Sequence, residues 1–164
     1  MGNRARHGVQ DSVGRSRCYR LKEVRTEIKL SASPERVWQV FTDLAAFKDW
    51  NPFIKEAEGD LKVGAKLWLY LQPPGGKGME FRPKVLSVVA NKEISWRGHV
   101  PVVFSGQHEF TMERIGENAT RFTQHSTFSG LATKFFGGDF FEGMRRGFES
   151  MEIAMKERVE HAPS

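Results

Sequence analysis

Hydrophobic and charged side chains alternate along residues 22–30, where Val24, Ile28 and Leu30 share one face. A period of two is typical of a strand that is buried on one side only. Apolar side chains then recur every three or four residues up to residue 44, which is the spacing of a helix that buries one face. The pattern therefore predicts a strand followed directly by a short helix.

Capping residues indicate where two short helices begin and end. Ser33 and Pro34 suit the N-cap and the first turn of a helix, because serine accepts a backbone hydrogen bond and proline has no N–H to satisfy. Residues 44–50 predict a second short helix. It should end before Asn51 and Pro52, because the residue ahead of a proline is pushed out of the helical region.

Beyond residue 53 the pattern changes to strand-like runs. The predicted strands cover residues 54–58, 66–72, 79–90, 93–100, 106–115 and 120–129. Clusters of Gly, Pro, Asn and Asp separate most of these runs, and such residues favour turns. In residues 66–72 two faces compete for the interior, since three leucines alternate with Trp68 and Tyr70. The whole region predicts an antiparallel meander.

A long helix is predicted at the C-terminal end. Asp139 follows two glycines and has Glu142 three residues later, the arrangement of a capping box. Phenylalanine and methionine then recur at helical spacing over about 20 residues. The order of one strand, two short helices, six strands and a long helix predicts an α+β domain. Its curved sheet of about seven strands should bury one face on the C-terminal helix.

The last two predicted strands have a register that charge and hydrophobicity both support. With a three-residue loop at 116–118, Glu113 lies opposite Arg121 on a polar face. The other face is apolar except for His108, Gln124 and Ser126, which this register brings together. Two interpretations of the cluster remain open. It is either a hydrogen-bonded part of the core or the polar end of a ligand pocket.

The net charge of +5 is concentrated at the N-terminus. Residues 1–25 contain seven basic and two acidic residues, whereas the other 139 contain eighteen of each. The body therefore lacks the positive surface that nucleic-acid binding needs, and no nucleic-acid partner is expected. We expect residues 1–19 to form a disordered basic tail and residues 20–164 to form a single domain.

The sequence gives little support for a disulfide, a metal site, a cofactor or a catalytic nucleophile. Cys18 is the only cysteine and the five histidines show no metal-ligand spacing, so neither a disulfide nor a zinc site is predicted. No phosphate-binding loop or nucleophile motif occurs, and no cofactor is expected. The chain has no apolar run long enough for a signal peptide or a membrane span, so we expect a cytoplasmic protein without integral membrane contact.

Several segments resemble the SRPBCC superfamily, the START and pollen-allergen-like helix-grip proteins. The opening resembles it at residues 28–38 (IKLSASPERVW), 41–44 (FTDL) and 50–53 (WNPF). Residues 106–110, 120–122, 128–130 and 146–151 are similar to its polyketide cyclase/dehydrase-like bacterial branch. The resemblance covers about residues 22–160. It implies a hydrophobic cavity between the sheet and the C-terminal helix, which relatives use for lipids, sterols, polyketides or plant hormones, some of them as cyclases.

The first hypothesis is a noncatalytic carrier or sensor of a small hydrophobic ligand. Its expected ligand-binding residues are Leu69, Phe81, Trp96, His108, Phe110, Phe122, Gln124, Ser126, Phe128, Phe140 and Met144. The alternative is a polyketide cyclase/dehydrase-like enzyme in which His108 is the acid or base. A third hypothesis is an interaction module that uses the basic tail or the face of Trp68 and Tyr70. The sequence does not indicate an oligomeric state.

Overall fold

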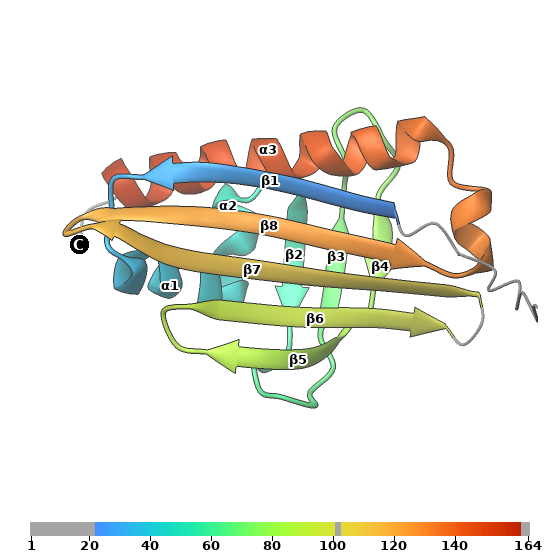
Figure 1. The fold of residues 1–164 in the computed structure, drawn as a ribbon, viewed down its shortest axis with the longest axis horizontal. Coiled ribbons are helices and arrows are strands. Elements are labelled where there is room, and N and C mark those ends of the chain that lie inside the picture. The colour runs from blue at the N-terminus through green and yellow to red at the C-terminus, as the bar shows by residue number, and fades with distance from the viewer. Residues whose placement is uncertain (1–21, 101–102, 162–164) are drawn as a thin grey trace, which may run out of the picture.

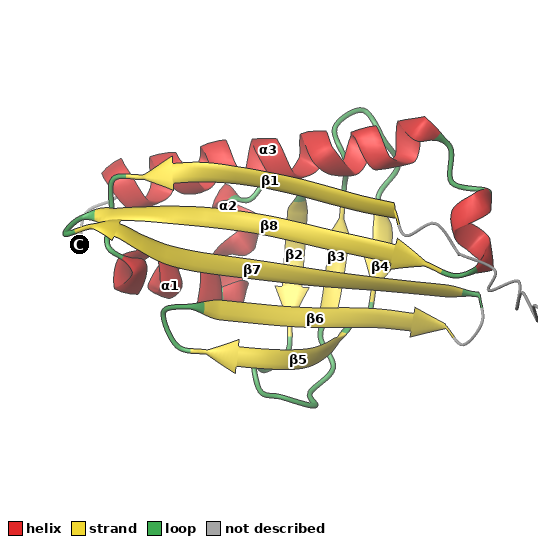
Figure 2. Cartoon of the chain, in the orientation of Figure 1, coloured by secondary structure: helices red, strands yellow, loops and turns green. Residues whose placement is uncertain are grey.

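The computed structural model describes residues 22–100 and 103–161, so the expected tail at 1–19 lies outside the described residues. The chain forms an α+β domain with two antiparallel sheets and a long C-terminal helix (Figures 1 and 2). The five-stranded sheet has the order β1-β8-β7-β6-β5, and the three-stranded sheet has the order β2-β3-β4. Figure 1 shows the short strands behind the long ones and crossing their direction. This is the predicted helix-grip architecture.

The strands and helices follow the predicted order closely. The strands are β1 (Lys22–Leu30), β2 (Ile54–Glu58), β3 (Trp68–Leu71), β4 (Met79–Phe81), β5 (Lys84–Val89), β6 (Glu93–Val100), β7 (Phe104–Gly116) and β8 (Ala119–Ser129). The helices are α1 (Pro34–Thr42), α2 (Phe47–Trp50) and α3 (Gly138–His161), with 3-10 turns η1 (Leu44–Ala46) and η2 (Leu131–Lys134). None of the helices in the described part of the chain is both long and apolar enough to cross a membrane.

Side-chain hydrogen bonds lie at two of the predicted helix boundaries, although the helix predicted at 44–50 is divided into η1 and α2. Ser33 Oγ accepts a hydrogen bond from the Arg36 N–H at 3.3 Å, and α1 begins at the following proline. After α2, Asn51 Oδ1 accepts hydrogen bonds from the backbone N–H groups of Phe53 at 3.0 Å and Ile54 at 2.9 Å. These bonds satisfy backbone donors where the chain turns from helix into β2.

The hairpin of β7 and β8 has the predicted register. His108 pairs with Ser126 and Phe110 pairs with Gln124 on the inner face. On the outer face Arg121 donates to Glu113 at 2.7 Å. The connection is shorter than predicted, because β7 runs on to Gly116 and the register shifts between Arg114 and Gly116. An irregularity of this kind changes the end of a hairpin without changing the alternation of faces along it.

One predicted strand is divided in the structure. The run at 79–90 forms β4 and β5, which belong to different sheets, so the domain has eight strands among the described residues. The break falls at Arg82 and Pro83. Proline has no backbone N–H for a sheet ladder, and the Pro83 carbonyl instead accepts from the Leu67 N–H at 2.9 Å.

Burial decides which face of β3 lies inside. Leu67, Leu69 and Leu71 are buried, whereas Trp68 and Tyr70 are partly exposed. The leucines are therefore the inner residues of a region that the sequence left ambiguous. The face of Trp68 and Tyr70 points away from the core.

Helix α3 is longer than predicted and begins two residues earlier than a helix capped by Asp139 would. It has 24 residues, and Asp139 lies in its first turn rather than at its N-cap. Met144, Phe148, Met151 and Met155 form its buried stripe, facing the sheets. The helix comes close to the chain after α2, because a Cβ on Gly147 would lie 2.4 Å from the Phe53 ring.

Candidate functional site

A cavity of about 740 Å³ opens between β4, the β6–β7 hairpin and the first turns of α3. Its lining consists of Leu71, Met79, Glu80, Phe81, Arg82, Gly98, His99, Phe104, His108, Phe128, Phe136, Phe140 and Met144. Most of these side chains are apolar, and the volume falls within the range of roughly 300–1,000 Å³ that small-molecule sites occupy. The cavity therefore has the size and the lining of a site for an apolar molecule.

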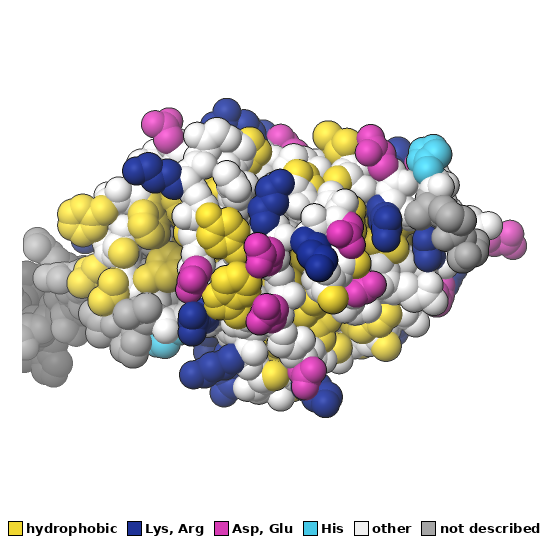
Figure 3. All heavy atoms as spheres, turned by 180° about the vertical axis from the view of Figure 1, so that it is seen from behind, with side chains coloured by type: hydrophobic (Ala, Val, Ile, Leu, Met, Phe, Trp, Pro, Cys, Tyr) yellow, Lys and Arg dark blue, Asp and Glu magenta, His cyan; other side chains and the backbone are white. Residues whose placement is uncertain are grey.

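Exposed apolar side chains occur in the segments at this end of the molecule. Val103 and Leu131 are 48% and 42% exposed, and Phe135 is 87% exposed. Figure 3 shows hydrophobic side chains gathered at the same end, on the left in that view. Single exposed apolar residues are normal, but several near a cavity mouth extend its apolar surface outward.

Gly98 allows the wall of the cavity to close around Phe81. A Cβ at residue 98 would lie 2.2 Å from the Phe81 ring, closer than any side chain tolerates. The ring of Phe81 in turn contacts His108 edge to face, with centroids 5.4 Å apart. The missing side chain in β6 therefore lets an aromatic wall reach the polar group at the base of the cavity.

His108 is the polar group at the base of the cavity. It is 5% exposed, and the rings of Phe81, Phe128 and Phe148 surround it with centroids 5.4, 5.8 and 6.3 Å away. Burial lowers the pKa of His108 from 6.5 to about 4, because the apolar surroundings disfavour the charged form. The imidazole is therefore neutral at pH 7.

One nitrogen of His108 is held by the protein. Nδ1 lies 2.7 Å from Ser126 Oγ, and the ring makes no second hydrogen bond among the described residues. A neutral imidazole has one donor and one acceptor nitrogen, and Ser126 occupies one of them in either tautomer. Nε2 is left as the polar atom that a ligand can use.

The deeper part of the interior is filled. Behind His108 a void bounded by Leu69, Trp96, Phe110 and Gln124 measures about 10 Å³, which is no more than the space of one water molecule. Further inward Phe41 packs on Phe110 and Phe122 with centroids 4.8 and 5.5 Å away. These rings form the solid core beyond the cavity.

The residues expected at the site thus divide by depth. Phe81, His108, Phe128, Phe140 and Met144 line the open cavity. Leu69, Trp96, Phe110 and Gln124 border only the small inner void, Phe122 lies in the packed core, and Ser126 stands behind His108. The inner face of the sheet is continuous, so its pattern alone does not show where the core ends and the cavity begins.

Sequence reasoning missed part of the lining. Phe104 and Phe136 both line the cavity. Phe104 precedes the predicted strand at 106–115, and Phe136 lies in the connection before α3. Aromatic residues in connecting segments are a weak signal, since loop conformation decides whether they fold over a site. Met79, at the start of β4, also lines the cavity.

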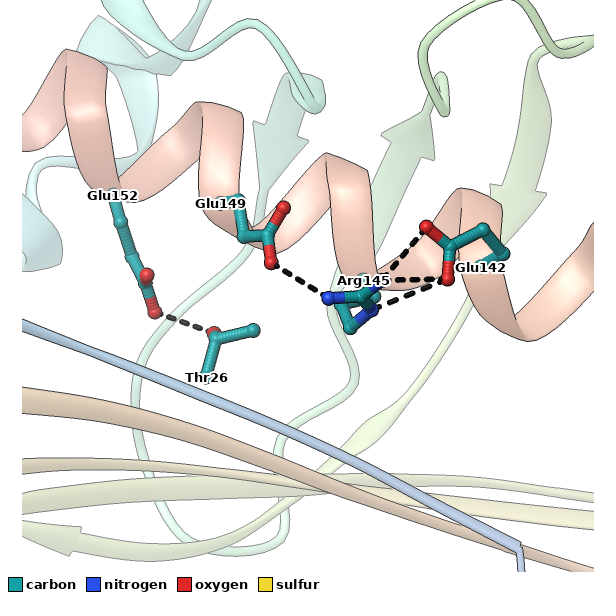
Figure 4. A network of polar contacts seen from close by, with 5 residues as sticks. All are labelled: Thr26, Glu142, Arg145, Glu149 and Glu152. Atoms are coloured by element: carbon teal, nitrogen blue, oxygen red, sulfur yellow. Dashed lines mark hydrogen bonds and ion pairs between the residues drawn. The ribbon is translucent and has the colours of Figure 1, made fainter.

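The polar cluster expected on the inner face is divided in two. Gln124 turns away from His108 and donates from Nε2 to the Phe148 carbonyl at 3.1 Å and to Glu152 Oε1 at 3.0 Å. Thr26 donates to the same carboxylate oxygen at 2.5 Å, as Figure 4 shows. Of the three residues that the register brings together, His108 and Ser126 hydrogen-bond to each other, whereas Gln124 hydrogen-bonds to α3.

Glu152 is a buried carboxyl that the sequence analysis did not single out. It is 3% exposed, and burial raises its pKa, although hydrogen bonds from Thr26 and Gln124 oppose the change. Its neighbours Glu142 and Glu149 instead pair with Arg145 on the exposed side of the helix (Figure 4). The sequence does indicate that this residue is buried, because Glu152 lies four residues after Phe148, within the apolar stripe of the helix.

No metal-binding cluster is found in residues 22–100 and 103–161. No group of three or more His, Cys, Asp or Glu side chains there has the geometry to hold an ion. Besides its apolar walls, the cavity is lined by the His108 imidazole with the Ser126 hydroxyl behind it, by His99, and by the ion pair of Glu80 and Arg82.

Comparison with solved structures shows the same fold in proteins of low sequence identity. TTHA0849 from Thermus thermophilus has a TM-score of 0.70 and 19% identity over 87% of this chain and 100% of its own. The Zhui aromatase/cyclase from Streptomyces sp. R1128 has a TM-score of 0.67 and 17% identity over 88% and 99%. A START superfamily protein from Mycobacterium smegmatis has a TM-score of 0.66 and 20% identity over 84% and 97%.

Sequence comparison is more specific about the family. No curated protein matches the chain. The family described as "Polyketide cyclase / dehydrase and lipid transport" matches residues 22–160, which include all the strands, α1, α2 and nearly all of α3. The chain therefore belongs to the polyketide cyclase/dehydrase and lipid transport family.

Proposed function

We propose that this protein is a carrier or sensor that binds a small hydrophobic ligand, such as a lipid, sterol or polyketide, in the cavity beside His108. The observation that carries the proposal is an open cavity of about 740 Å³ with mainly apolar walls and one buried, neutral imidazole at its base. Phe81, Phe128, Phe140 and Met144 would contact the ligand. Ser126 and Gln124 would support this wall from behind.

Apolar burial would supply most of the binding free energy. Burial is worth about 25 cal/mol per Å², so a ligand that buries about 300 Å² of apolar surface gains roughly 7 kcal/mol before ordering costs are subtracted. A hydrogen bond to His108 Nε2 would fix the orientation of the ligand rather than dominate its affinity.

A cyclase/dehydrase-like enzyme is the second candidate. His108 favours it, because a neutral imidazole whose Nδ1 is held by Ser126 can accept a proton at Nε2. An efficient base, however, has a pKa near the working pH, and a pKa of about 4 makes His108 a weak base at neutral pH. For this reason we place binding ahead of catalysis.

The cavity is tested first by identifying what it holds. Native mass spectrometry of the freshly purified protein, followed by solvent extraction, should reveal a stoichiometric apolar molecule. Binding of the neutral fluorescent probe N-phenyl-1-naphthylamine then tests whether the apolar cavity is the binding site. Phe140→Asp should weaken probe binding at least about tenfold, because it puts a carboxylate into the apolar cavity on a half-buried helix position.

Ile153→Asp is the matched control. It makes the same kind of change on the same helix at a side chain that is 58% exposed and does not line the cavity. Probe binding that survives Phe140→Asp, or falls equally in both variants, would refute the proposed site.

A His108→Gln variant distinguishes the two candidate functions. Turnover of a polyketide-type substrate that disappears while probe binding remains would favour the enzyme.

A further inference from the structure

A second pocket lies outside the cavity, between the short helices and the end of α3. Its volume is about 400 Å³, and its polar lining comes from Arg36, Gln39, Asp43, Trp50 and Arg158. Arg158 is fourteen residues after Met144 along α3, and a rise of 1.5 Å per residue separates the two pockets by roughly 20 Å. The second pocket is therefore a separate site on the opposite half of the helix.

The charged groups of this pocket have no partners within the described part of the chain. Neither guanidinium, of Arg36 or of Arg158, makes an ion pair or a side-chain hydrogen bond there, and Asp43 makes none either. Arg114 and Arg145, by contrast, each pair with a carboxylate at 2.8 Å or less. Two unpaired guanidinium groups at one pocket form a concentrated positive charge with directed donors.

Trp50 supplies an independent observation. Its indole Nε1 is buried and has no hydrogen-bond acceptor, although the side chain lines this pocket. The ring is held edge-on against Phe47 with centroids 5.3 Å apart, so the packing around it is defined. A buried donor without an acceptor is costly in a folded protein, and a ligand oxygen that reached Nε1 from the pocket would remove that cost.

The donors of this pocket match a phosphate group better than a carboxylate. Two guanidinium groups, the Gln39 amide and the indole N–H offer more N–H donors than the two oxygens of a carboxylate take up, whereas a phosphate monoester presents three strong acceptor oxygens. Asp43 would repel the phosphate but can accept hydrogen bonds from hydroxyl groups. The volume also exceeds that of a bare phosphate ion and leaves room for a body of sugar size.

We propose that the pocket formed by Arg36, Asp43, Trp50 and Arg158 binds a small polyol phosphate, with the phosphate on the arginines and the hydroxyl groups toward Asp43. The site is independent of the apolar cavity and of the function proposed for it. The protein would then respond to two chemically different ligands, one at each half of α3.

Isothermal titration calorimetry with glucose 6-phosphate as the probe tests the proposal. Arg36→Gln and Arg158→Gln should each weaken binding at least about tenfold, because each removes a charge-assisted hydrogen-bonding group. Trp50→Phe keeps an aromatic ring but removes the N–H, and it should weaken binding several-fold. Arg146→Gln is the control, because it makes the same charge change at an exposed arginine of α3 that lies outside this pocket and forms no ion pair with another described residue.

Several outcomes would overturn the proposal. The first is that titration with millimolar glucose 6-phosphate releases no heat. The second is that Arg146→Gln loses as much affinity as the pocket variants. The third is that the protein binds vesicles containing phosphatidic acid but not the soluble ester. Inorganic phosphate should bind more weakly than glucose 6-phosphate, and glucose should not bind. Binding of N-phenyl-1-naphthylamine should be unchanged in Arg158→Gln, so the two sites are tested separately.

Discussion

Two buried titratable residues, His108 and Glu152, respond to pH in opposite directions. Burial lowers the pKa of His108 to about 4 and raises the pKa of Glu152. The folded state therefore resists protonation of the histidine and resists ionisation of the carboxyl. Linkage converts both effects into a dependence of folding stability on pH.

His108 should destabilise the protein as the pH falls. Because its pKa is lower in the folded state, its contribution is fully present above pH 6.5 and is lost as the pH falls toward 4. The full loss amounts to about 3 kcal/mol, at 1.36 kcal/mol for each pKa unit. We expect His108→Gln to flatten this part of the curve, measured by urea unfolding between pH 7 and pH 4. An unchanged slope in the variant would contradict the assignment.

Glu152 should have the opposite effect. Because its pKa is higher in the folded state, its contribution is present below the unfolded pKa near 4.5 and is lost as the pH rises through the folded value. Glu152→Gln keeps an acceptor for Thr26 and Gln124 but cannot ionise. The variant should therefore gain stability relative to the wild type between pH 5 and pH 8 in urea unfolding. Glu149→Gln, at an exposed carboxyl of α3, should show no such trend.

At the scale of elements, helix α3 packs on the rest of the domain through its apolar stripe and through the close approach of Gly147 to Phe53. Gly147 faces the Phe53 ring, while Gly143 faces Pro73 at an ordinary contact distance. Both glycines are buried and both lie within the helix, where alanine is intrinsically favoured by about 1 kcal/mol. Alanine at either position would therefore bring the same gain in helix propensity, so a difference in stability between the two variants would report on packing.

The two glycines should respond to alanine with opposite signs. At Gly143 the new Cβ would lie 3.7 Å from the Pro73 Cβ, so the variant should gain about 0.5–1 kcal/mol. At Gly147 the Cβ would lie 2.4 Å from a buried ring, and overpacking of roughly 1–3 kcal/mol should outweigh the gain in propensity. Urea unfolding of the two variants measures both effects. A stabilising Gly147→Ala would show that α3 moves freely away from Phe53.

At the scale of the whole molecule, charge and binding surfaces are separated along the chain. The cavity and the arginine-lined pocket lie on different halves of α3, and the body from residue 26 onward carries equal numbers of basic and acidic residues. The excess positive charge belongs to the N-terminal 25 residues. The described fold from Lys22 onward contains all the residues that line both pockets.

Removal of residues 1–21 should leave folding and probe binding unchanged. The shortened chain has twenty basic and nineteen acidic residues, so its net charge falls from +5 to +1. We expect the same urea midpoint and the same affinity for N-phenyl-1-naphthylamine, with a much earlier elution from a cation-exchange column. A lower midpoint would show that the N-terminal segment contributes to the fold.

Local pattern determined the elements and the register of the last hairpin. Alternation has a period of two in a strand, so a slip of one residue would have placed Phe110 opposite Thr123 or His125 and mixed the polar and apolar faces. That constraint is local, and the pairing of His108 with Ser126 followed from it. The family was also visible in short segments such as residues 28–38, and the matching of residues 22–160 confirmed it.

Only the tertiary structure decided where the core ends and the cavity begins. Phe122 and Phe128 lie on the same inner face of β8, yet one packs against Phe41 and the other lines the cavity. The tertiary structure also directs the Gln124 amide toward Glu152 and brings Arg36 and Arg158 to one pocket. These outcomes depend on how curved sheets, loops and α3 meet across more than a hundred residues of sequence. A periodic pattern states which side of an element is buried but not what lies opposite it.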